Sequence, residues 1–204
     1  MSDLVAMRKA GLHVAETAAP VLGFTLVYAT TTRLPLALAT GLGMAALVAI
    51  HRFRQARSIW PAAGGFALTA GAAAITALSG EATDFFLPVL LLRTAVVLIT
   101  PIMLLLRWPP VGLAAGVLTG RGLAWRRCPV RLRAYTIANL VWVAAEGALV
   151  ANQVRLYLAD RAVAMGAFKL LVEVPVHVLL AVLMWGIYRR LTRQPCDCHQ
   201  GERS

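Results

Sequence analysis

The chain has 204 residues, of which 59% are hydrophobic and 14% charged, and its mean hydropathy is +0.72. Soluble domains have about 45–50% apolar and about 25% charged residues, so this composition excludes an ordinary soluble domain. The formal net charge of +11 raises the possibility of nucleic-acid binding. The basic residues cluster between apolar runs, however, and we therefore expect a membrane protein with no nucleic-acid partner.

Six apolar runs predict six transmembrane helices. They cover about residues 13–31, 34–50, 61–79, 85–106, 134–158 and 163–188. Each run approaches the roughly 20 residues that a spanning helix requires, and none alternates like a barrel strand. Residues 109–120 are too short to span and predict an interfacial or re-entrant segment inside a basic loop, 107–133. The expected fold is an all-α membrane bundle, a single transmembrane domain over residues 1–204.

The distribution of lysine and arginine predicts the orientation of the bundle. With both termini in the cytoplasm, the inner segments hold most of the basic residues, and the outer loops hold only Arg33 and Arg161. Cytoplasmic loops are enriched in Lys and Arg, so both termini are expected to be cytoplasmic. The sequence thus predicts a multi-pass protein of the bacterial plasma membrane, whose basic face rests on anionic lipid headgroups.

Several charged residues fall inside the apolar runs: Glu16, Arg93, Glu146, and the Lys169/Glu173 pair. An Arg or Asp at the centre of a membrane helix costs roughly 2.5–3.5 kcal/mol by insertion scales. Such groups are therefore expected to face one another or a polar cavity.

Helical spacing groups these residues with other polar and aromatic side chains. Asn139, Trp142 and Glu146 share one stripe of the run 134–158. Lys169, Glu173 and His177 follow at intervals of four and are expected on one face of the run 163–188, because residues four apart lie above one another on a helix.

Two interpretations of this polar group remain open. In the first, the residues brace the helices, and Arg93 pairs with Glu146 or Glu173. In the second, they form a chemical site, in which a buried carboxyl without an adequate partner stays protonated and acts as a general acid. Aromatic rings near such an acid stabilise a cation by about 0.5–2 kcal/mol each.

Motifs for other chemistry are missing from the sequence. It contains no P-loop, HExxH, CxxC or GxSxG motif, and no DDxxD motif of the kind that holds Mg²⁺ and a diphosphate. Magnesium sites need carboxylates, so an ionisation-type prenyl enzyme is not expected. The sequence therefore predicts neither a metal nor a cofactor.

Three stretches resemble a known family: EATDFFLP (81–88), RWPPVGLAAGVLTG (107–120) and AWRRCPVRLRAYTIANLVW (124–142). They resemble an actinobacterial family of small polytopic membrane proteins that is distantly similar to intracellular septation protein A. The chain also resembles integral-membrane terpene cyclases of indole-diketopiperazine terpenoid pathways, which are of similar size and lack a diphosphate motif. The second resemblance implies an enzyme that protonates an alkene or epoxide and guides the cation through ring closure.

The leading hypothesis is a membrane-embedded terpene cyclase that acts on a lipophilic prenylated small molecule with a farnesyl-type chain. Glu146 is the expected proton donor, and Glu173 or Asp84 is the terminating base or a second acid. The expected substrate-binding residues are Trp142, Phe86, Arg93, Asn139, Phe168 and His177. The alternatives are a non-enzymatic envelope or septation-associated protein, and a small proton-linked transporter that uses Glu146 and Glu173 as a relay.

Overall fold

The computed structural model describes residues 18–55, 60–118, 120 and 122–192. Within these ranges the chain is all-helical, with 90% helix and no strand, which confirms the predicted all-α class. Glu16 and the first part of the predicted span 13–31 lie outside the described residues.

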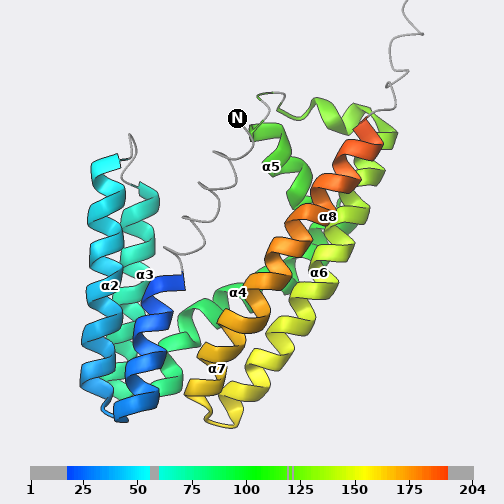
Figure 1. The fold of residues 1–204 in the computed structure, drawn as a ribbon. Helices are drawn as coiled ribbons and strands as arrows, with labels where there is room; N and C mark the ends of the chain where they lie inside the picture. Colours follow the sequence, from blue (N-terminus) through cyan, green and yellow to red (C-terminus); the bar gives the residue numbers. More distant parts are fainter. Residues whose placement is uncertain (1–17, 56–59, 119, 121, 193–204) are drawn as a thin grey trace, which may run out of the picture. The chain divides into compact units, whose positions relative to one another are not determined.

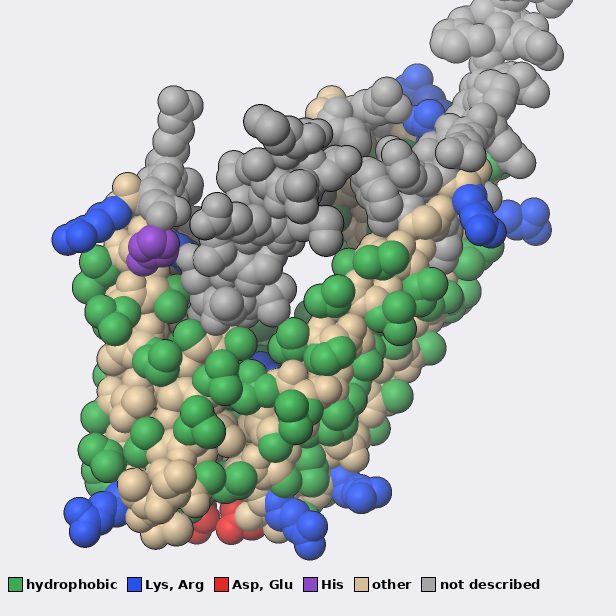
Figure 2. Space-filling view, in the orientation of Figure 1, with side chains coloured by type: hydrophobic (Ala, Val, Ile, Leu, Met, Phe, Trp, Pro, Cys, Tyr) green, Lys and Arg blue, Asp and Glu red, His purple; other side chains and the backbone are tan. Residues whose placement is uncertain are grey.

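In the part of the chain that the structure describes, four helices are long and apolar enough to cross a membrane: Leu34–Arg54, Ala82–Leu105, Pro129–Leu158 and Ala162–Met184. Two shorter apolar helices, Ala18–Thr31 and Ala63–Ser79, correspond to the first and third predicted spans. Large apolar side chains on these helices are exposed, including Leu98 at 65% and Val182 at 62%. Figure 2 shows hydrophobic side chains along the helices and Lys and Arg side chains near their ends. These features identify a membrane protein, because water would not tolerate so much exposed apolar surface.

The chain divides into two compact units. The first contains Met1–Leu91 and Asn152–Pro175, and the second contains Leu92–Ala151 and Val176–Ser204. In the first unit, α2 (Leu34–Gln55) packs beside α3 (Trp60–Ser79), as Figure 1 shows. The 3₁₀ helix η1 (Ala82–Phe86) contacts both α3 and the short helix α7 (Ala162–Phe168).

An aromatic cluster forms the core of the first unit. Phe24, which is 1% exposed, stacks on Phe85 with ring centroids 4.1 Å apart. Phe86 packs edge-on against both rings. Such stacked and edge-on pairs contribute about 0.5–1.5 kcal/mol beyond their buried area. They hold η1 against the Ala18–Thr31 helix.

The second unit contains most of α4 (Leu87–Leu105), α6 (Pro129–Leu158) and α8 (Val174–Thr192), together with α5 (Pro110–Leu118) and η2 (Ala124–Arg127). The nine-residue α5 is too short to span, as the sequence predicts. Trp125 of η2 packs against Gly112 and Gly116 of α5, where an added Cβ would meet its ring. Helix α6 begins at Pro129 rather than at residue 134, because proline is well suited to a first helical position.

The helix predicted over residues 163–188 is interrupted. A π-helical turn, Lys169–Glu173, separates α7 from α8. A π turn holds more residues than an α turn, so the spacing between Lys169 and Glu173 departs from that of a regular α-helix. In place of one uninterrupted helix over residues 163–188, the structure has two α-helices joined by this turn.

Gly166 lies where α7 approaches the Ala18–Thr31 helix. A Cβ on Gly166 would collide with the side chain of Thr25. We expect Gly166→Ala to lower the free energy of unfolding by about 1–3 kcal/mol, the usual cost of overpacking. The measurement is unfolding in mixed detergent micelles, followed by circular dichroism.

Gly43→Ala in α2 is the matched control, because no heavy atom lies within 4 Å of the added Cβ. It should leave stability unchanged or raise it by up to about 1 kcal/mol, since alanine is the better helix former. Equal stability of the two variants would contradict the close approach of α7 to the Ala18–Thr31 helix.

Candidate functional site

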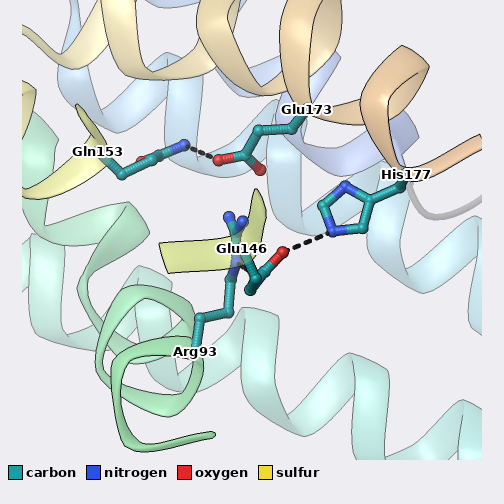
Figure 3. Close-up of polar contacts among 5 residues, drawn as sticks. All are labelled: Arg93, Glu146, Gln153, Glu173 and His177. Carbon is teal, nitrogen blue, oxygen red and sulfur yellow. Dashed lines mark hydrogen bonds and ion pairs between the residues drawn. The ribbon is translucent and has the colours of Figure 1, made fainter. Parts of the chain in front are cut away.

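Glu146 is a buried carboxylate on α6, with 3% of the residue exposed, and two basic side chains of the second unit converge on it. The Nε of Arg93, on α4, donates to Glu146 Oε1 at 2.6 Å. The Nε2 of His177, on α8, lies 2.9 Å from Glu146 Oε2 (Figure 3). We call Arg93, Glu146 and His177 the charge cluster. It joins three helices through one residue from each.

Exposure differs across the charge cluster. The side chain of Glu146 is 4% exposed, that of Arg93 16%, and that of His177 42%. Each carboxylate oxygen has its own basic partner, so the arrangement is that of an ion pair with a hydrogen-bonded imidazole. An ionised carboxylate only accepts hydrogen bonds, so the imidazole Nε2 is the donor of the second contact. His177 is the most exposed member of the cluster.

A second polar pair lies in the first unit. Gln153 Nε2 donates to Glu173 Oε1 at 2.8 Å, and each residue is 3% exposed (Figure 3). Glu173 is the last residue of the π-helical turn, and such turns occur often at functional sites. Unlike Glu146, Glu173 meets an uncharged amide in this contact.

Two further contacts in the first unit connect η1 to the end of α6. The hydroxyl of Tyr157 donates to Asp84 Oδ1 at 2.6 Å, and that of Thr83 donates to Asp160 Oδ1 at 3.0 Å. Asp160 has a φ of 50° and ends α6, with Arg161 N–H donating to the Leu156 carbonyl at 3.1 Å. This backbone bond is the 6→1 closure of a Schellman motif. The contact between Asp84 and Tyr157 lies in the last turn of the same helix.

The remaining predicted site residues have different surroundings. Asn139 is fully buried, and its Nδ2 donates to the Tyr135 carbonyl at 3.0 Å, while its Oδ1 has no partner within the described part of the chain. Trp142 and Phe168 are half-buried. Phe86 belongs to the aromatic core of the first unit, where packing accounts for its position.

The sequence did not predict the contact between Glu146 and His177. Of the two partners expected for Arg93, Glu146 and Glu173, the structure shows a contact with Glu146 at 2.6 Å. Helical spacing groups His177 with Lys169 and Glu173 of its own run and does not identify a partner on another helix. No residue in KLLVE marks the π turn.

A metal site would need several ligand side chains together. Within the described ranges, no group of three or more His, Cys, Asp or Glu residues is placed to hold a metal ion.

Comparison with known proteins identifies the family. Residues 11–195 match the model of the family described as "Protein of unknown function (DUF3159)", and the chain belongs to that family. No curated protein and no solved structure matches. The resemblances to intracellular septation protein A and to terpene cyclases therefore remain predictions from the residues.

The ion pair between Arg93 and Glu146 is testable by a double-mutant cycle. Arg93→Gln and Glu146→Gln should each cost up to about 3–5 kcal/mol of unfolding free energy, because each removes one partner of a buried ion pair. The double variant should cost clearly less than the sum of the two, since the pair is then removed as a whole. The measurement is again unfolding in mixed micelles.

Arg155→Gln is the control, because Arg155 lies on the same helix but is exposed. It should change stability by less than about 0.5 kcal/mol. Additive effects of Arg93→Gln and Glu146→Gln would contradict a direct ion pair.

Proposed function

We propose that this member of the family is a multi-pass protein of the bacterial plasma membrane that works as a small proton-linked transporter. The observation that carries the proposal is the contact between His177, with its 42% exposed side chain, and the buried carboxylate of Glu146. Histidine changes charge near neutral pH, and carboxylate–histidine chains within membrane helices commonly relay protons.

The charges of the cluster suggest which kind of solute is transported together with the proton. With a neutral imidazole, the positive charge of Arg93 and the negative charge of Glu146 cancel. Protonation of His177 leaves a net charge of +1, which is costly at membrane depth. An anion bound beside the imidazolium would offset that cost. We therefore propose that one proton moves together with one small monovalent anion.

The transporter proposal includes six membrane crossings with both termini in the cytoplasm. The four long apolar helices and the two shorter ones supply six candidate crossings. The sparse basic residues of the proposed outer loops, Arg33 and Arg161, support this orientation.

The terpene cyclase is the second candidate. It is favoured by Trp142, which lies one turn before Glu146 on α6 and could face a cation. The pairing with Arg93 counts against Glu146 as the proton donor, because a nearby guanidinium favours the ionised carboxylate. In this alternative His177 would supply the proton. The product would be an isomer of the substrate, since the proton gained at the start is lost at the end.

The test of transport uses the full chain in proteoliposomes with a trapped pH-sensitive dye. A gradient of the carried anion directed into the vesicles should move protons in with it. The anions tested are radiolabelled monocarboxylates and inorganic phosphate. We expect His177→Gln to reduce this flux to the rate of empty vesicles, because the variant lacks a titratable group. His51→Gln, at an exposed histidine of α2, should keep the full rate.

Flux through His177→Gln at the unchanged rate would overturn the transport proposal. The cyclase is tested in parallel by incubating the same vesicles with a farnesylated indole and separating isomers by chromatography. An isomer formed by the unaltered protein, together with no proton flux, would establish the cyclase in place of the transporter.

A further inference from the structure

A pocket of about 770 Å³ opens in the second unit, where the end of α4 meets the beginning of α6. Most of its wall is apolar, and two arginines, Arg107 and Arg133, complete it. Both arginines are exposed. No acidic side chain lines the pocket, so its described lining carries two positive charges. The apolar wall includes Leu104, Leu105, Val130 and Ile137.

The backbone explains why Arg107 lies at this pocket. Helix α4 ends in a Schellman motif: Arg107 N–H donates to the Leu104 carbonyl at 3.0 Å, and Trp108 N–H donates to the Met103 carbonyl at 2.8 Å. Arg107 has a φ of 58°, a left-handed conformation that usually belongs to glycine. A residue with a Cβ is less favourable than glycine in this backbone conformation. The arginine at this position therefore points to a role for its guanidinium group.

Arg133 is positioned by the start of α6. The helix begins at Pro129, so Arg133 lies one turn into it. The pocket thus has a guanidinium from the end of one membrane-spanning helix and another from the start of the next. Guanidinium groups bind phosphate oxygens through two parallel hydrogen bonds, which makes arginine suited to a phosphate ligand.

The pocket combines two properties that a single kind of ligand satisfies. Its apolar wall at the ends of spanning helices fits acyl chains, and its paired arginines fit a negative headgroup. Basic pockets at the ends of membrane helices commonly bind anionic lipid headgroups. A free phosphate ion would leave the apolar wall uncovered, and a zwitterionic lipid would leave the positive charge uncompensated.

We propose that this pocket is a binding site for one anionic phospholipid. Its phosphate lies between Arg107 and Arg133, and its acyl chains lie against Leu104, Leu105 and Ile137. The site is separate from the charge cluster and does not depend on the transport proposal. Its occupant would come from the leaflet beside the end of α4.

Native mass spectrometry of the full chain in detergent provides the test. Phosphatidylglycerol and phosphatidylcholine with identical acyl chains are titrated separately, and the bound lipid is counted. We expect one phosphatidylglycerol to bind at least about tenfold more tightly than phosphatidylcholine, as a charge-assisted contact would give. Arg107→Gln and Arg133→Gln should remove this preference, while binding of phosphatidylcholine stays the same.

Two control variants separate binding from folding. Arg107→Gly removes the charge and suits the left-handed backbone, so it should keep the melting temperature and still lose the preference. Arg155→Gln removes an exposed charge elsewhere on α6 and should keep the preference. Equal affinity of the unaltered protein for the two lipids would overturn the proposal. So would an unchanged preference in Arg107→Gly, or inorganic phosphate that binds the arginines as tightly as the lipid does.

Discussion

The cost of an uncompensated charge within a membrane helix constrains the second unit of this protein. Arg93 and Glu146 lie on different helices, and each would be expensive to bury alone. Their contact at 2.6 Å therefore specifies which faces of α4 and α6 meet. His177 adds a third helix to the same carboxylate. One buried group thus holds three helices together, and its protonation state matters to all of them.

The three predicted catalytic carboxylates have different environments. Glu146 contacts a guanidinium and an imidazole, Glu173 accepts a hydrogen bond from the amide of Gln153, and Asp84 accepts one from the hydroxyl of Tyr157. The imidazole of His177 is the partner of Glu146 that changes charge near neutral pH, and we therefore assign proton exchange to it. Asp84 contacts a tyrosine in the last turn of α6. Glu173 is distinguished by the π turn that it closes.

Apolar and basic side chains also occupy different parts of the helices. The long apolar helices expose large apolar side chains, as at Leu98 and Val182, whereas most of the Lys and Arg side chains visible in Figure 2 lie near the helix ends. The end of α4 adds a local feature, because Arg107 occupies a left-handed position that glycine would fill more easily. Arg107 thereby lines a pocket whose described lining contains a second arginine and no acidic residue.

The sequence by itself determined the all-α membrane class and most helix boundaries, since hydropathy and length act locally along the chain. It also singled out Arg93, Glu146 and His177 as members of the polar group. Only the tertiary structure decided their partners, because Arg93 and Glu146 are 53 residues apart, and Glu146 and His177 are 31 apart. The π turn between α7 and α8 is a further feature that no residue of KLLVE marks. Contacts between distant residues depend on how whole helices pack, which local patterns do not encode.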